Sequence, residues 1–153
     1  MVGIFAWLAS APLNAIGARV GNLMDSAFGF LDNTEVGIAL YETTLSGSWI
    51  LVILGAASAY VLAPLVEEMA FRGCLYRWCR VRMTWIPTAI VVGLAFGIIH
   101  PYSPGGMIQV AIGGIAYGLL QELRQSLYAP IVAHCLHNLT MQFFMNEIYT
   151  SLM

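Results

Sequence analysis

Long apolar runs, separated by proline, glycine and short polar stretches, fill the chain from about residue 49 onward. A helix of ~16 residues covers only about 24 Å of a hydrocarbon core that is ~30 Å thick, so such helices must tilt or the bilayer must thin. The pattern predicts five helices, the first ending or kinking at Pro64, over residues 49–63, 65–82, 85–100, 107–120 and 128–146.

The first 47 residues are less regular. Residues 1–24 are weakly apolar and are interrupted by Pro12 and Asn14, which predicts a short or interfacial helix. The stretch "DSAFGFLDNTE" that follows is typical of a loop outside the bilayer. No basic residues precede the first apolar run, which argues against a cleaved signal peptide. We expect one domain, with an N-terminal helix and loop over 1–47 and a functional core over 48–153.

Composition indicates a membrane protein. Hydrophobic residues make up 59% of the chain and charged residues only 9%, against roughly 25% charged residues in soluble domains, and the mean hydropathy is +0.79. An unusually apolar soluble protein would still need a polar outer face on each helix, and several segments have none. We therefore expect an all-α, polytopic transmembrane helix bundle of about five to six helices.

Charge and cysteine usage narrow the classes of partner. The net charge is −2 and the chain has no lysine, so no basic patch for nucleic acid is present. Cys74, Cys79 and Cys135 lack metal-type spacing and are best explained as small apolar side chains.

Arginines predict the orientation of the bundle. Arg77, Arg80 and Arg82 fall in one connection and Arg124 in another, with two predicted helices between the connections. Both connections are therefore expected on the same side of the membrane, and the positive-inside tendency makes that side cytoplasmic.

The candidate site consists of ionisable side chains in apolar segments, where such a side chain costs several kcal/mol unless it is paired or hydrated. In "EEMAFR", Glu68 and Arg72 lie four residues apart and share a helix face, as a structural ion pair would. Glu67 points about 100° away around the helix axis. It has no partner within this segment, which makes it the candidate general base.

Two further segments carry histidines. "FGIIH" places Phe96 and His100 on one helix face, and "HCLHN" places His134 and Asn138 on one face with His137 to the side. Taken singly, a histidine at a helix C-terminus is favoured by the helix dipole, and a histidine and an amide can hold neighbouring helices together. Taken with Glu67, they supply the groups that activate a water and stabilise the oxyanion of a carbonyl being hydrolysed.

The order EExxxR, FxxxH and HxxxN in successive helices resembles the CAAX prenyl protease and bacteriocin-processing family of intramembrane proteases, also called the Abi family. The flanking stretches "APLVEEMAFRG" and "SLYAPIVAHCLHN" agree with that family, and the resemblance covers about residues 50–145. It implies an intramembrane endopeptidase acting on a membrane-associated protein or peptide. Prenylated CAAX tails are the eukaryotic substrates, and bacterial relatives are linked to bacteriocin processing or self-immunity. The compact chain favours an integral protein of the bacterial cytoplasmic membrane.

The resemblance also implies roles for individual residues. Glu67 and His100 would activate the attacking water, while His134 and Asn138 would stabilise the oxyanion. Glu68 and Arg72 occupy supporting positions of the motif.

The use of a metal stays open at this point, because members of the family have been described both as metalloproteases and as glutamate-dependent enzymes. Glu67, His100 and His134 could supply three ligands to a zinc ion. No HExxH motif is present, which excludes the site-2-protease type of zinc site.

Two other classes of protein share parts of this pattern. A non-catalytic immunity or scaffold protein could retain the polar cluster for helix association alone. A small transporter or channel subunit would need a second half with matching broken helices, which the sequence lacks. For all four site residues to meet, we expect the helix after Pro64 to begin inside the membrane, with a re-entrant or broken backbone.

Overall fold

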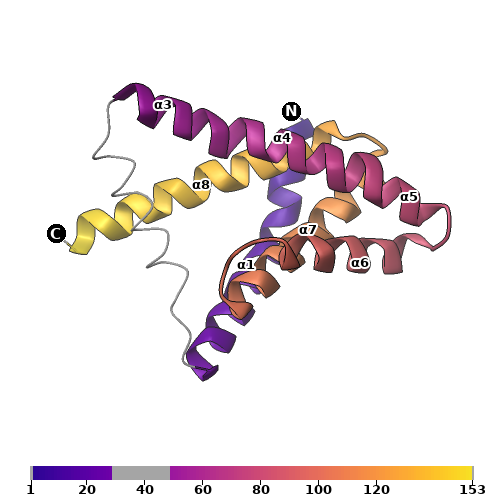
Figure 1. Cartoon of the computed structure of the whole chain (residues 1–153), viewed down its shortest axis with the longest axis horizontal. Coiled ribbons are helices and arrows are strands. Elements are labelled where there is room, and N and C mark those ends of the chain that lie inside the picture. Colours follow the sequence, from indigo (N-terminus) through magenta and orange to yellow (C-terminus); the bar gives the residue numbers. More distant parts are fainter. Residues whose placement is uncertain (1, 29–48, 153) are drawn as a thin grey trace.

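The computed structural model describes residues 2–28 and 49–152, and these residues fold into helices without any strand (Figure 1). The predicted all-α class is thereby confirmed, and the described part contains five continuous helical stretches. The elements are α1 (Val2–Phe28), α3 (Trp49–Ala57), η1 (Ser58–Leu62), α4 (Ala63–Glu68), η2 (Met69–Tyr76), α5 (Arg77–Arg80), α6 (Trp85–Ile98), α7 (Pro104–Arg124) and α8 (Tyr128–Leu152).

The helix predicted to stop at Pro64 continues past it. Elements α3 to α5 form one unbroken stretch, called the long helix below, in which η1 and η2 are π-helical. Pro64 is the second residue of α4. The π turn before it keeps the chain helical, although the missing N–H of the proline leaves a carbonyl of that turn without a backbone donor. The predicted break or re-entrant start is therefore wrong, because a change of hydrogen-bond register takes the place of a break.

The N-terminal helix is also longer than predicted. Helix α1 is 27 residues long and contains Pro12, where a short helix was expected. The predicted loop begins within it, since Asp25–Phe28 are helical, and the rest of that loop lies outside the described residues. The division of the chain at residue 47 stays a prediction.

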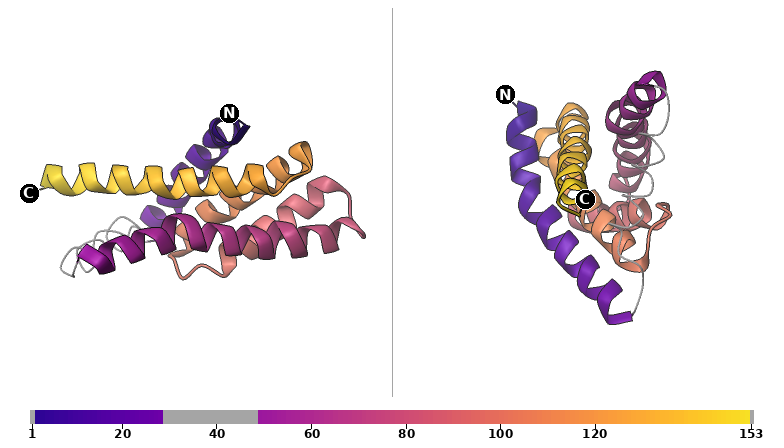
Figure 2. Two further views of the ribbon diagram at one scale, coloured as in Figure 1. Left: turned by 90° about the horizontal axis from the view of Figure 1, so that it is seen from above. Right: turned by 90° about the vertical axis from the view of Figure 1, so that its left-hand side faces the viewer.

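Helix α7 is the centre of the bundle, with α1, α6 and α8 packed against it (Figure 2). Its glycines allow this close approach. A Cβ at Gly97 of α6 would lie 2.3 Å from the carbonyl oxygen of Met107, and one at Gly21 of α1 would lie 2.5 Å from that of Gly105. The buried carboxylate of Asp25 accepts hydrogen bonds from Ser103 Oγ (2.6 Å) and Gly105 N (2.9 Å), which fixes α1 at the start of α7.

One helix in the described part is long and apolar enough to cross a membrane, over Val52–Arg80, and Trp85–Ile98 is a shorter apolar helix. Only 11% of the most apolar window of the longer helix is buried, unlike the core helix of a soluble protein. Large apolar side chains also face outward from α1, α3 and α6, among them Leu23, Trp49 and Ile98. These exposed faces suit a lipid environment, and a polytopic arrangement stays a prediction.

The arginine-rich connections meet as expected. Arg80 Nε and Nη2 donate to the two carboxylate oxygens of Glu122 at 2.9 and 3.0 Å, and Glu122 lies two residues before Arg124. The connection after α5 and the connection after α7 are therefore at the same end of the bundle. All three cysteines are free, with Cys79 buried in the apolar core, in agreement with their prediction as apolar side chains.

Candidate active site

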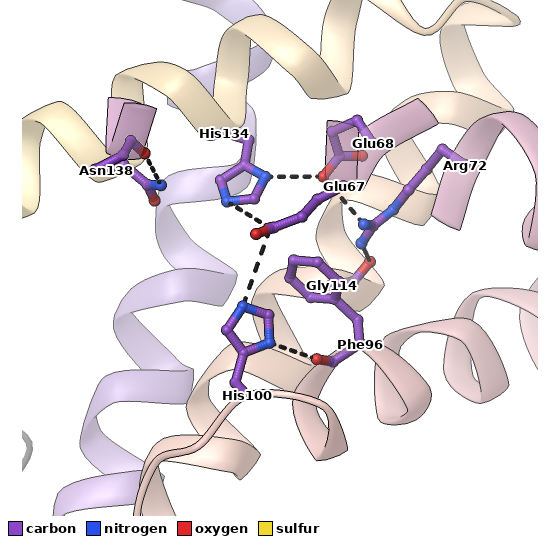
Figure 3. A network of polar contacts seen from close by, with 9 residues as sticks. Glu67, Glu68, Arg72, Phe96, His100, Gly114, His134 and Asn138 are labelled. Carbon is purple, nitrogen blue, oxygen red and sulfur yellow. Dashed lines mark hydrogen bonds and ion pairs between the residues drawn. The ribbon is translucent and has the colours of Figure 1, made fainter. Parts of the chain in front are cut away.

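The predicted site residues come from three separate segments, the long helix, the end of α6 and α8, which meet near the middle of the long helix (Figure 3). Glu67 and Glu68 end α4, and Arg72 lies in η2. His100 follows the end of α6, and His134 lies on α8. Because α4 contacts α8 and η2 contacts α6, these side chains approach one another although 67 residues separate Glu67 from His134.

Glu67 faces both histidines. Its Oε2 lies 3.8 Å from Nε2 of His134 and 4.0 Å from Nε2 of His100. These separations exceed a direct hydrogen bond. The Glu67 side chain is 28% exposed, and those of His100 and His134 are 18% and 7% exposed. The three side chains thus converge while each keeps some exposed surface.

The hydrogen bonds of the two imidazoles fix which nitrogen faces Glu67. Nδ1 of His100 is 2.7 Å from the carbonyl oxygen of Phe96, and Nδ1 of His134 is 3.0 Å from Oε1 of Glu68. A carbonyl or carboxylate oxygen only accepts, so each Nδ1 carries the hydrogen and donates it. In the neutral ring, each Nε2 therefore presents its lone pair to the space beside Glu67.

Glu68 and Arg72 form the ion pair that their spacing predicted. Both side chains are fully buried, and Arg72 Nη1 donates to Glu68 Oε1 at 3.0 Å. Arg72 Nη2 also donates to the carbonyl oxygen of Gly114 at 2.7 Å, and its guanidinium carbon lies 4.5 Å from the ring centroid of Phe96. The same Glu68 oxygen accepts from His134, so the pair also orients an imidazole of the site.

Two contributors could not be recognised from sequence spacing. The ring of Tyr117 stacks on His134 at 4.9 Å between centroids, and the Gly114 carbonyl on the same helix accepts from Arg72. Neither belongs to a motif with the histidines or carboxylates, because each contact depends on how α7 packs against its neighbours. Phe96, which the FxxxH pattern did contain, packs edge-on against both His100 and His134 at 4.8 and 5.7 Å.

Asn138 is held away from Glu67. It lies one turn beyond His134 on α8, and its Nδ2 donates to the carbonyl oxygen of Ala59 in η1 at 3.1 Å (Figure 3). In η1 the N–H of Ala63 donates to Ser58, five residues back. The next donor in that register, to Ala59, would come from Pro64, which has no N–H. Asn138 supplies the donor that Pro64 lacks.

This arrangement predicts a coupled effect on stability. Asn138→Ala should lower the free energy of unfolding by about 0.5–1.5 kcal/mol, the net contribution of one hydrogen bond, since this bond is exposed and the Ala59 carbonyl then loses its donor. In a Pro64→Ala background the loss should be much smaller, because a backbone N–H becomes available to Ala59. Thermal unfolding in detergent micelles measures both effects, with Thr140→Ala, whose hydroxyl bonds only within α8, as the matched control. Equal losses in the two backgrounds would contradict this explanation.

A shared metal does not fit the side chains as they lie. Two ligand atoms of a tetrahedral zinc ion are about 3.3 Å apart at bond lengths of ~2.0–2.1 Å, closer than Glu67 Oε2 is to either Nε2. Within residues 2–28 and 49–152, no group of three or more His, Cys, Asp or Glu side chains is placed to hold a metal ion. The side chains as they lie place a carboxylate near two oriented imidazoles, and the zinc alternative stays a prediction.

Comparison with known proteins identifies a family for the chain. A family model described as type II CAAX prenyl endopeptidase Rce1-like matches residues 47–140, which include every candidate site residue. No curated protein and no solved structure matches the chain. The resemblance predicted from the three motifs is confirmed, and the chain belongs to the type II CAAX prenyl endopeptidase Rce1-like family.

Proposed function

We propose that the protein is an intramembrane endopeptidase that hydrolyses a peptide bond of a membrane-associated protein or peptide with water activated by Glu67. The observation that carries the proposal is the meeting of Glu67 with Nε2 of both His100 and His134, at 4.0 and 3.8 Å, in a chain of a protease family. The apolar, outward-facing helix over Val52–Arg80 supports a location in the membrane.

Glu67 and His100 act on the attacking water. Nδ1–H of His100 donates to an uncharged carbonyl. Nε2 of His100 can therefore accept a hydrogen bond from the attacking water and orient that water. Glu67 takes the other water proton while the water oxygen attacks the scissile carbonyl carbon. The Glu67 carboxylate gains here from its fixed position beside the nucleophile.

His134 stabilises the oxyanion that forms. The carboxylate of Glu68 accepts from Nδ1 and orients the ring, and in the doubly protonated ring Nε2–H donates to the oxyanion. The protonated Glu67 next gives its proton to the leaving amine nitrogen, and the C–N bond breaks. Water has then added its hydroxyl to the acyl product and a proton to the amine, and Glu67 is a carboxylate again. Asn138 as a second oxyanion donor stays a prediction, since its amide nitrogen already donates to Ala59.

Cleavage by the purified protein tests this proposal. Substrates should include a farnesylated CAAX peptide, which the description of the family suggests, the same peptide without the lipid, and a set of peptides from membrane helices. Mass spectrometry of the products locates the cleaved bond. Cleavage that requires Glu67 supports the proposal. Equal cleavage by wild type and Glu67→Gln overturns it, and cleavage of none of these substrates favours a non-catalytic immunity or scaffold protein.

Chelation should leave the activity intact. Because Glu67, His100 and His134 are too far apart for one tetrahedral ion, we expect an excess of 1,10-phenanthroline to change the cleavage rate by less than about twofold. Metal analysis of the active preparation should give zinc well below one ion per chain. A loss of activity that added zinc restores would instead establish the metal-dependent alternative.

A further inference from the structure

A cavity of about 390 Å³ lies at the arginine-rich end of the bundle, away from the candidate active site. It is lined by the ends of the long helix and of α7, including Tyr76, Arg77, Gln121 and Gln125. The apolar span ends at Arg80, so the cavity lies at the level where the hydrocarbon core gives way to the lipid headgroups. A phospholipid that borders the protein therefore presents its phosphate at this height.

One positive charge in the cavity is not neutralised. Arg80 is paired with Glu122 through both of its carboxylate oxygens, and these hydrogen bonds hold the pKa of Glu122 below its ordinary value. The pair is therefore ionised and close to neutral overall. Arg77 has no hydrogen-bond or ion-pair partner within the described part of the chain, so the cavity carries one free guanidinium, which matches one phosphodiester group.

A buried acceptor in the same cavity lacks a donor. Gln121 is only 6% exposed, and its Oε1 has no hydrogen-bond partner. A buried amide oxygen without a donor is destabilising, and a ligand with an N–H or O–H group satisfies it once a rotation of the Gln121 side chain turns the oxygen into the cavity. The cavity also has an apolar lining residue, Val81, whose side chain is exposed, as the start of an acyl chain requires.

We propose that this cavity binds the headgroup of a phospholipid that carries both a phosphodiester and a hydrogen-bond donor, namely an ethanolamine or glycerol headgroup. Arg77 takes the phosphate, and the ammonium or hydroxyl group donates to Gln121 Oε1. The acyl chains lie outside and start beside Val81. This site is independent of the chemistry at Glu67, because no residue is shared between the two.

Thermal unfolding of the full chain in a neutral detergent, with lipids added, tests the site. Dioleoyl phosphatidylethanolamine and dioleoyl phosphatidylglycerol should each raise the unfolding midpoint by about 5 °C or more near saturation. Dioleoyl phosphatidylcholine has the same phosphate and chains but a quaternary ammonium without N–H, and it should raise the midpoint by less than about 1 °C. Equal shifts with the ethanolamine and choline lipids would overturn the proposal.

Variants and a soluble headgroup complete the experiment. Arg77→Gln and Gln121→Leu should each remove most of the shift, and both are expected to fold, since Arg77 is exposed and leucine removes an unpaired acceptor. The matched control is Arg82→Gln, because Arg82 lies outside the cavity over the ring of Trp78, and this variant should keep the shift.

Glycerophosphoethanolamine, a soluble headgroup without acyl chains, should give no shift of the unfolding midpoint. A shift with this soluble compound but not with the lipids would reassign the cavity to a free phosphodiester, and retention of the lipid shift by Arg77→Gln would overturn the proposal.

Discussion

Replacing Glu67 by glutamine should lower kcat by about 10²- to 10⁴-fold, the usual contribution of a positioned general base. Glutamine keeps the shape of the side chain but cannot take a proton from water. KM should change little, because in the proposed mechanism Glu67 acts on the water and not on the substrate before the attack. The unfolding midpoint should also stay close to that of the wild type, since the Glu67 carboxylate is partly exposed and lies beyond hydrogen-bond distance from either histidine.

Steady-state cleavage of the same peptide by a series of variants separates this expectation from a general structural effect. Glu67→Asp retains a carboxylate at a shorter reach and should keep more activity than Glu67→Gln. His100→Gln and His134→Gln should both be slow. The control is His137→Gln. His137 is on the same helix as His134 but points to the side of the face that His134 occupies, so this variant should cleave at nearly the wild-type rate. Loss of activity in His137→Gln equal to that in Glu67→Gln would contradict the assigned roles.

Local periodicity allowed much of the site to be predicted. Residues four apart on a helix must share a face, so the pairing of Glu68 with Arg72 and the position of His100 one turn after Phe96 followed from spacing alone. The convergence of three such segments followed from the resemblance to a family, not from any spacing. The orientation of each imidazole depends on acceptors that the packing supplies, the Phe96 carbonyl and the Glu68 carboxylate.

Proline limited the prediction of the fold. Pro12 and Pro64 were each expected to interrupt a helix, and both lie inside continuous helical stretches. The rule that proline breaks a helix concerns the lost N–H and the clash with the preceding turn. At Pro64 a π turn precedes the proline and a side chain from α8 satisfies the freed carbonyl. Asn138, which donates to the freed carbonyl, lies 74 positions from Pro64 in the sequence. No local sequence pattern could therefore predict its contribution.

Glu68 connects the stability of the bundle to the chemistry of the site. Its Oε1 accepts hydrogen bonds from both Arg72 and His134, so the buried ion pair sets the direction of an imidazole that faces Glu67. A purely structural pair, as spacing alone suggests, would have no such consequence. Separating the two roles requires variants that restore the packing without restoring the carboxylate.

Arg72→Ala should lower the free energy of unfolding by about 3–5 kcal/mol, the largest loss expected for any single change in the chain. It leaves the carboxylate of Glu68 fully buried and without its cation, and it removes the donor to the Gly114 carbonyl. The loss appears as a lower unfolding midpoint in detergent micelles. Arg82→Ala is the matched control, since that exposed arginine should change stability by no more than about 0.5 kcal/mol.

The double variant Glu68→Leu with Arg72→Met should recover most of the lost stability, because apolar residues of similar volume commonly replace a buried ion pair with little net cost. Its activity should stay low, since Nδ1 of His134 then has no carboxylate to hold the ring in its orientation. Restored folding with restored activity would show that Glu68 serves stability alone. Restored folding without activity would establish that the buried carboxylate orients His134. Since an apolar pair could then fill the same space without loss of stability, this orienting role is what the ion pair adds.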